Sequence, residues 1–203
     1  MARWIKMKSV VIVHGWGDDS ESGWIPWLAS KLRQKGIETI APDMPNTETP
    51  KIGEWVPFLA GQIKNSDSDL FLVGHSIGCQ AILRYLETLP EGSRIGGTVL
   101  VAGWTTLAGL SDGEKAVAEP WENTPIDWQK VSARAGSFIC IYSDNDPYVP
   151  EANAQLLREK LNARLVLDSG QGHFSEENDV TQLPVALNEL LTITGLPIDA
   201  AII

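Results

Sequence analysis

The sequence predicts an α/β fold in which a parallel β-sheet lies between two layers of helices. Short apolar runs of the kind that form strands alternate along the chain with longer amphipathic stretches. Continuously apolar runs are typical of strands buried on both faces, and parallel neighbours need a crossover connection, usually a helix. At 203 residues and 43% hydrophobic composition, the chain is expected to form one domain over residues 1–203.

The chain is expected to begin with a strand, a helix and a second strand. Residues 9–13 form an apolar run that ends at a glycine-containing turn, which indicates a buried strand. Residues 24–35 carry apolar side chains at helical spacing and precede Gly36, a natural helix stop. Residues 38–41 end at a proline-rich turn, and we expect the second strand there.

A second helix and a third strand follow. Thr49 and Pro50 suit the N-cap and the first turn of a helix that runs to about residue 64. Pro57 lies inside this segment and predicts a kink or a late start. Residues 70–74 are four strand-forming apolar residues and a glycine, and they predict the third strand.

This strand runs directly into Gly74-His75-Ser76-Ile77-Gly78, and apolar side chains at helical spacing predict a helix from there to residue 89. G-x-S-x-G between a strand and a helix is the nucleophile elbow, a sharp turn that exposes a serine hydroxyl. The two glycines let strand and helix approach closely, while Ser76 takes the strained backbone conformation. The Ile77 amide, at the helix N-terminus, can serve as one donor of an oxyanion hole.

The C-terminal half continues the alternation. Apolar runs predict strands at residues 97–102, 138–142 and 164–167. Two helices are expected, each with a proline at or near its start, at residues 151–161 and 183–191. The apolar end of the chain, from residue 195 to residue 203, has no periodicity that predicts an element.

The connection between the fourth and fifth strands, residues 104–135, is far longer than usual. It contains Trp104, Trp121 and Trp128 and an acidic, glycine-containing middle. A long aromatic loop above strand ends is a candidate lid or pocket wall. An ordinary helix pair packed on the sheet is the alternative, and residues 127–134 fit that description.

Serine is a poor nucleophile at neutral pH and needs a base to accept its proton. The chain has three histidines. His75 adjoins Ser76 in the turn, so its side chain must point elsewhere, and His14 precedes the first loop. His173 lies in a glycine-containing loop after the last strand, where its side chain can reach over the elbow. The order Ser, Asp, His along the chain favours His173 as the base.

A carboxylate must fix the tautomer of this histidine and stabilise its cation. Asp144 and Asp146 both follow the fifth strand directly. We favour Asp146, because Pro147 restricts it to an extended conformation in a rigid loop, whereas Asp144 suits a local turn cap. Asp168 is the third candidate, although it ends the strand before His173 and would have to fold back.

The second oxyanion donor is expected from the loop after the first strand, beside the elbow. Its sequence is His14-Gly15-Trp16-Gly17. Two glycines let the backbone approach the site, and the Trp16 amide can then face the developing oxyanion.

Together these motifs resemble the retinoblastoma-binding serine hydrolase family of compact α/β-hydrolases. The similarity extends from Val10 to about Leu191 and also includes the Trp24 helix and the turn at residues 42–45. The segments that carry it are His-Gly-Trp-Gly at 14–17, Gly-His-Ser-Ile-Gly at 74–78, Asp-Pro-Tyr-Val-Pro at 146–150 and Gly-His-Phe at 172–174.

The resemblance implies a serine hydrolase with the catalytic triad Ser76, Asp146 and His173. It also implies a three-layer α/β/α domain that lacks the first two strands of larger α/β-hydrolases, with six parallel strands in the order 2-1-3-4-5-6. The animal member binds retinoblastoma protein through a Leu-x-Cys-x-Glu motif. Neither Cys79 nor Cys140 has that context, so this partner is not expected.

We expect hydrolysis of small carboxylic esters through an acyl-enzyme, with no metal and no organic cofactor. An amide or peptide hydrolase or an acyltransferase on the same triad is the alternative, and a non-catalytic interaction protein is the alternative from another class. By position, Trp16, Trp104, Val149 and Phe174 are candidates to line the substrate pocket, although each could equally belong to the core.

Composition excludes some partners. The formal net charge of −10 argues against a nucleic acid or an anionic membrane surface, because both need a basic patch. Cys79 and Cys140 lie among apolar residues and are expected to be buried thiols rather than a disulfide or metal pair. No signal peptide or membrane span is recognised, so we expect a cytoplasmic protein, while its natural substrate and oligomeric state stay open.

Overall fold

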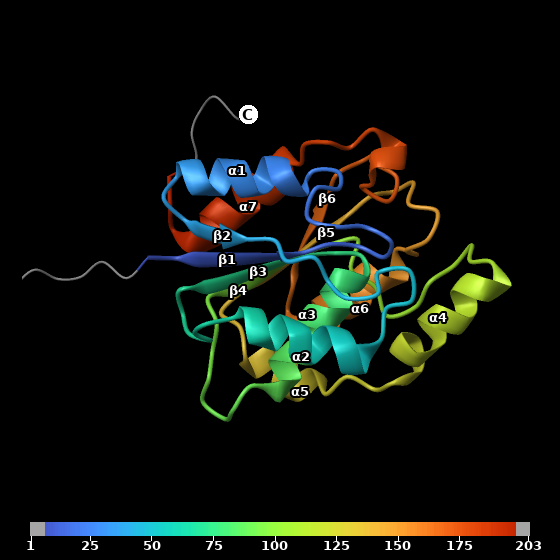
Figure 1. Cartoon of the computed structure of the whole chain (residues 1–203), viewed down its shortest axis with the longest axis horizontal. Coiled ribbons are helices and arrows are strands. Elements are labelled where there is room, and N and C mark those ends of the chain that lie inside the picture. Colours follow the sequence, from blue (N-terminus) through green and yellow to red (C-terminus); the bar gives the residue numbers. More distant parts are fainter. Residues whose placement is uncertain (1–6, 198–203) are drawn as a thin grey trace, which may run out of the picture.

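The computed structural model describes residues 7–197, which contain a six-stranded β-sheet between two layers of helices (Figure 1). All neighbouring strands are parallel, and their order is β2-β1-β3-β4-β5-β6. The predicted fold class and strand order are confirmed. The strands are β1 (Ser9–Val13), β2 (Glu38–Ile40), β3 (Leu70–His75), β4 (Gly97–Val101), β5 (Phe138–Tyr142) and β6 (Arg164–Leu167).

Helices cover both faces of the sheet, as strands buried on both sides require. On one face lie α1 (Ile25–Gln34) and α7 (Pro184–Thr194) (Figure 1). On the other lie α2 (Ile52–Gln62), α3 (Ile77–Thr88), α5 (Trp128–Ala133) and α6 (Ala152–Leu161). A further helix, α4 (Asp112–Asn123), stands apart from the sheet, and a short 3-10 turn, η1 (Glu176–Asn178), follows β6.

The start of α2 differs from the sequence prediction. α2 begins at Ile52, so the prediction of Thr49 as its N-cap is wrong. The Pro50 carbonyl, which a helix starting there would use internally, instead accepts a hydrogen bond from the Trp121 indole at 2.9 Å. Pro57 does lie inside α2, on its exposed side, where water can bind the carbonyl group that loses its helical partner.

The long connection between β4 and β5 contains α4 and α5 and is therefore largely helical. α4 starts with a capping box, in which the Ser111 hydroxyl accepts from the Glu114 amide and the Glu114 carboxylate accepts from the Ser111 amide. Its C-terminal end is anchored by Trp121, which is buried and whose carbonyl accepts from the Arg84 guanidinium. α4 is thus fixed at one end and exposed at the other; movement as a lid stays a prediction.

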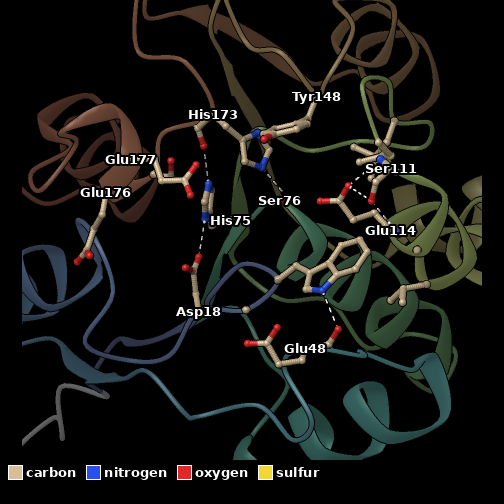
Figure 2. Close-up of a pocket in the computed structure, with 17 residues that line it drawn as sticks. Asp18, Glu48, His75, Ser76, Ser111, Glu114, Tyr148, His173, Glu176 and Glu177 are labelled. Atoms are coloured by element: carbon tan, nitrogen blue, oxygen red, sulfur yellow. Dashed lines mark hydrogen bonds and ion pairs between the residues drawn. The ribbon is translucent and has the colours of Figure 1, made fainter.

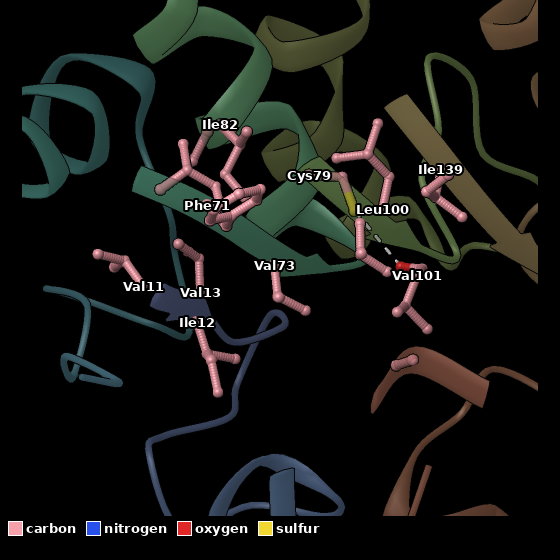
Figure 3. Close-up of a cluster of buried hydrophobic side chains, with 14 of the residues drawn as sticks. Val11, Ile12, Val13, Phe71, Val73, Cys79, Ile82, Leu100, Val101 and Ile139 are labelled. Atoms are coloured by element: carbon pink, nitrogen blue, oxygen red, sulfur yellow. Dashed lines mark hydrogen bonds between the residues drawn. The ribbon is translucent and has the colours of Figure 1, made fainter. Parts of the chain in front are cut away.

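Aliphatic and aromatic side chains from the strands and the covering helices form one core cluster. Figure 3 shows the part around the central strands. Along β1, Val11 and Val13 point to one face of the sheet and Ile12 to the other, as the alternation of side chains along a strand requires. Phe71 of β3 pairs with Val10 of β1 and therefore points to the face of Ile12, whereas Ile82 of α3 lies beside Gly74 on the face of Val13.

Both cysteines are buried free thiols, as predicted. The Cys79 thiol donates to the Val101 carbonyl at 3.4 Å (Figure 3). Burial raises the pKa of Cys140 to about 12 and also raises the pKa of Cys79 well above its ordinary value. The two thiols are therefore protonated core residues. Within residues 7–197, no helix is both long and apolar enough to cross a bilayer.

Candidate active site

Ser76 sits at the turn between β3 and α3 in a conformation that few residues adopt. Its φ is 51° and its ψ is −118°, and its amide donates to the Val101 carbonyl at 2.9 Å. The neighbouring glycines explain how the turn closes. A β-carbon on Gly78 would lie 2.4 Å from the Val13 carbonyl oxygen, and one on Gly74 would lie 2.8 Å from the Cys79 nitrogen. The strained elbow predicted from G-x-S-x-G is therefore present.

The structure brings Ser76, His173 and Asp146 into one hydrogen-bonded chain (Figure 2). The Ser76 Oγ lies 2.9 Å from His173 Nε2, and His173 Nδ1 lies 2.8 Å from Asp146 Oδ2. Because a carboxylate oxygen can only accept, Nδ1 carries the ring proton and Nε2 can accept from the serine hydroxyl. This tautomer is the one that a general base needs.

Asp146 is held firmly in place. Its side chain is 3% exposed, and Oδ1 accepts hydrogen bonds from the Tyr148 amide at 2.9 Å and the Val149 amide at 3.0 Å. Oδ2 is thereby left to face His173. The rigid loop expected around Pro147 orients the carboxylate through its own backbone amides.

The other two aspartates considered for this position have different partners. Asp144 Oδ1 accepts from the Gly170 amide at 2.9 Å, so the expected local turn cap is wrong. It connects instead to the loop that carries His173. Asp168 directly follows β6, burial raises the pKa of its carboxyl, and it makes no hydrogen bond to His173. Asp146 is therefore the one of these three carboxylates that bonds to His173.

Of the two predicted oxyanion donors, Ile77 directly follows Ser76 in the chain, and Trp16 lines the same pocket as Ser76 from the loop after β1. Neither the Trp16 amide nor the Ile77 amide donates a hydrogen bond to another described residue. The loop that carries Trp16 is held by His14, whose Nδ1–H donates to the Gly15 carbonyl at 2.8 Å and whose Nε2 accepts from the Met44 amide at 2.9 Å. The role of the Trp16 and Ile77 amides as an oxyanion hole stays a prediction.

Ser76 opens into a pocket of about 660 Å³ (Figure 2). Apolar side chains from the β1 loop, the connection before α4, α4 itself and the Asp146 loop form part of its wall: Trp16, Leu107, Leu110, Val117 and Tyr148. Tyr148 packs edge-on against the His173 ring, with centroids 5.3 Å apart. A pocket of this size accommodates a small organic substrate next to the serine.

Residues 10–192 match the sequence model of a family described as serine hydrolase. The chain belongs to the serine hydrolase family. Its relatives include the putative hydrolase YdeN of Bacillus subtilis, which is 32% identical over 184 residues, covering 90% of this chain and 94% of YdeN. Another is the rat serine hydrolase RBBP9, 28% identical over 187 residues, covering 91% and 96%. The predicted resemblance to the retinoblastoma-binding serine hydrolases is confirmed.

Solved structures agree with this assignment. The crystal structure of the B. subtilis ydeN gene product superposes with a TM-score of 0.86 at 30% identity, covering 93% of this chain and 100% of the other. Est1E from Butyrivibrio proteoclasticus shares the fold at 16% identity, with a TM-score of 0.68 and coverage of 94% and 89%. The serine hydrolase therefore has the α/β-hydrolase fold throughout its described length.

Three of the four predicted pocket residues of this serine hydrolase lie elsewhere. Trp16 lines the pocket, whereas Trp104, Val149 and Phe174 do not and are buried in the core cluster. Phe174 illustrates the reason. It follows His173, but at φ 57° its backbone turns and its ring packs inward. The sequence interpretation missed Tyr148, although its position between two prolines after Asp146 was a usable signal.

Carboxylates also border the pocket of this serine hydrolase, and none of the described residues that line it is a lysine or an arginine. They come from the β1 loop, the segment before α2, the start of α4 and the turn η1: Asp18, Glu48, Glu114, Glu176 and Glu177 (Figure 2). A pocket bordered by one sign of charge attracts ligands of the opposite sign. Among residues 7–197, no group of three or more His, Cys, Asp or Glu side chains is arranged to hold a metal ion.

The acid stability of the enzyme is expected to depend on His14. Burial lowers the pKa of His14 below its usual 6.5, against a smaller raising effect of the Gly15 carbonyl. The unfolded chain therefore binds this proton more readily, and the free energy of unfolding should fall as the pH drops from about 6.5 to the lower folded-state pKa. In His14→Gln, Oε1 can still accept from the Met44 amide but does not titrate. Urea denaturation at pH 7.5 and pH 5 should show that the free energy of unfolding falls less between these pH values in His14→Gln than in the wild type. An equal fall in both proteins would contradict the role of His14.

Proposed function

We propose that this serine hydrolase cleaves small carboxylic esters through an acyl-enzyme on Ser76. The observation that carries the proposal is the unbroken chain from Ser76 Oγ to His173 to Asp146, with both distances below 3 Å. A serine hydroxyl hydrogen-bonded to an imidazole, itself oriented by a buried carboxylate, is the arrangement that activates a nucleophile.

In this mechanism, His173 Nε2 takes the Ser76 proton as Oγ attacks the ester carbonyl. The Trp16 and Ile77 amides would hold the negative oxygen of the tetrahedral intermediate, each contributing about 3 kcal/mol. His173 then donates the proton to the departing alcohol, which leaves an ester of Ser76. A water molecule, deprotonated by His173, attacks this ester, and collapse of the second intermediate releases the carboxylic acid and restores the Ser76 hydroxyl. Asp146 stays ionised and stabilises the imidazolium.

Pocket size and wall chemistry support a small, partly apolar substrate. About 660 Å³ next to Ser76 suits a short acyl or alkyl group against Trp16 and Tyr148. The same triad could transfer the acyl group to an amine or alcohol, or cleave an amide, which demands more effective protonation of the leaving group. A panel of p-nitrophenyl esters of increasing acyl length, with aminoacyl amides alongside, ranks these substrate classes.

A fluorophosphonate probe tests the proposal without knowledge of the natural substrate. Such probes form a covalent bond with activated serines, so the wild-type enzyme should be labelled and Ser76→Ala should not. Peptide mass spectrometry locates the label. An unlabelled wild type would support a non-catalytic protein on a hydrolase scaffold, and a label that persists in the variant would place the nucleophile elsewhere.

The carboxylates around the pocket are expected to favour a cationic ester over its neutral isostere. The comparison is an ester of choline with the ester of 3,3-dimethylbutanol, which differ in charge at nearly constant shape. We expect kcat/KM for the cation to be about tenfold higher at low ionic strength and the difference to shrink in 1 M salt, where the Debye length is about 3 Å.

Charge-neutral variants connect this preference to the pocket. Glu48→Gln and Glu177→Gln remove carboxylates that border it, and Glu159→Gln on the exposed side of α6 is the matched control. The preference should decrease in the first two and stay unchanged in the third. A wild-type preference for the neutral ester would show that these carboxylates do not govern binding.

A further inference from the structure

His75, the residue before Ser76, makes a contact that the proposed mechanism does not use. Its side chain is 4% exposed, and its Nε2 lies 2.8 Å from the backbone carbonyl oxygen of His173 (Figure 2). A carbonyl can only accept, so His75 Nε2 carries a proton and donates it. The residue that adjoins the nucleophile is therefore bonded directly to the main chain of the proposed base.

This bond is one of few that fix the main chain at His173. The His173 amide donates to Asn178 Oδ1 at 2.9 Å, and the next carbonyl, that of Phe174, accepts from the Trp24 indole at 3.1 Å. Neither of those bonds reaches the strand that carries the nucleophile. The bond from His75 does, because Ser76 is its covalent neighbour. Together with the Ser76–His173 hydrogen bond, it connects the end of β3 directly to the loop that carries His173.

Asp18 and Trp24 fix the orientation of the His75 ring. Asp18 Oδ2 lies 3.5 Å from His75 Nδ1, on the side of the ring opposite the His173 carbonyl (Figure 2). Trp24 packs edge-on, with centroids 5.9 Å apart. Burial raises the pKa of Asp18, but its interactions with His75, His14 and the Gly15 backbone together lower it by more, so the pKa lies below its usual value.

Gly15 makes room for this arrangement. A β-carbon at Gly15 would lie 2.6 Å from Asp18 Oδ2 and 2.9 Å from His75 Nδ1. A larger residue at this position would therefore displace the Asp18 carboxylate or the His75 ring. Three segments meet at His75: the loop after β1, the end of β3 and the loop after β6.

We propose that His75 is a positioning residue that holds His173 at reacting distance from Ser76, with Asp18 acting through the His75 ring. This inference rests on the proposed function of the triad. A displacement of a reacting group by about 1 Å can lower the rate about 100-fold. Loss of the His75 donor leaves the His173 carbonyl without its partner and lets the loop shift by a fraction of that distance.

Two substitutions of nearly equal length separate positioning from packing. In His75→Gln, the side-chain amide reaches about as far as Nε2 and can donate to the His173 carbonyl. In His75→Met, the side chain has similar length but no N–H group. We expect kcat for p-nitrophenyl butyrate to fall about 30-fold in His75→Met, with KM within twofold of wild type, and to fall less than about fivefold in His75→Gln.

Thermal melting and the rate of fluorophosphonate labelling accompany the kinetics. If His75→Met fails to fold, His75→Asn replaces it, because its shorter amide is polar but cannot reach the carbonyl. Asp18→Asn should lower kcat by a smaller factor, about threefold to tenfold, and should have no further effect in the His75→Met background. Equal kcat in the Gln and non-donor variants, whether low or high, would overturn the proposal. Equal kcat in those variants overturns only the role of His75 when the wild type is active and Ser76→Ala is inactive. An inactive wild type overturns both proposals.

Discussion

Replacement of Ser76 by alanine should lower kcat for ester hydrolysis by at least about 10⁴-fold. The hydroxyl is the atom that becomes acylated, and no neighbouring group can take its place, since Cys79 is a buried thiol that donates to the Val101 carbonyl. Hydrolysis by a water molecule activated by His173 sets the residual rate. KM should change little, because the pocket wall is unaltered. Steady-state kinetics with p-nitrophenyl butyrate measures both constants.

The same variant should remain folded, which separates chemistry from stability. Alanine at this position has to adopt the same φ of 51° as serine, so the backbone strain is unchanged. The lost hydrogen bond to His173 is worth only about 1 kcal/mol. A thermal melt within a few degrees of wild type is therefore expected. Ester turnover that survives in a folded Ser76→Ala enzyme would contradict Ser76 as nucleophile.

Asparagine in place of Asp146 should lower kcat by about 10⁴-fold, whereas asparagine in place of Asp144 should lower it less than about threefold. Both changes are isosteric and remove one charge. At position 146, the amide can present its NH₂ group to His173 Nδ1, which then favours the tautomer with the proton on Nε2. That tautomer cannot accept the Ser76 proton, and the imidazolium also loses its counter-charge.

At position 144, the Asn side chain keeps its carbonyl oxygen. This oxygen can still accept from the Gly170 amide, the bond that Asp144 makes at 2.9 Å. The loop that carries His173 is thus supported in the variant. Measurement of kcat for the two purified variants at one pH decides whether Asp146 or Asp144 is the supporting carboxylate. A larger loss in Asp144→Asn would transfer the role of the supporting carboxylate to Asp144.

The elbow and the positions of the strands could be predicted from the sequence because both depend on strong local signals, whereas the strand order was implied by the resemblance to the family. Gly74 and Gly78 flank Ser76 at the spacing that a strand–turn–helix requires, and continuous apolar runs identify strands buried on both faces. The same reasoning selected Asp146 from the restriction that Pro147 imposes. In each case the deciding residues are neighbours in sequence.

The pocket wall could not be predicted in the same way. Trp104 and Phe174 lie next to strand ends and the proposed base, but whether an aromatic ring faces a pocket or the core depends on packing by distant segments. A helix pair within residues 104–135 was left as an alternative, but the bounds of α4 were not predicted, because its apolar face is narrow: within it only Ala118 and Trp121 are buried. Its start signal, Ser111 followed by Glu114, was present and unused.

The contact of His75 could not be found from the sequence at all. Its partner is a backbone carbonyl 98 residues away. Every residue has a backbone carbonyl, so the sequence does not show which of them a side chain will bind. The sequence interpretation stated only that this side chain must point away from Ser76. The structure adds where it points, and that direction is the basis for treating it as part of the site's support.

Trapping of the acyl-enzyme tests the central claim most directly. The wild-type enzyme is mixed with p-nitrophenyl butyrate, quenched in acid within milliseconds to seconds, and digested for peptide mass spectrometry. We predict one butyryl group per chain, located on Ser76. When deacylation is slow, as in a His173→Ala background rescued with imidazole, we also predict a burst of one p-nitrophenol per chain. A butyryl group on any other residue, or turnover with no acylated peptide in either background, would contradict the account.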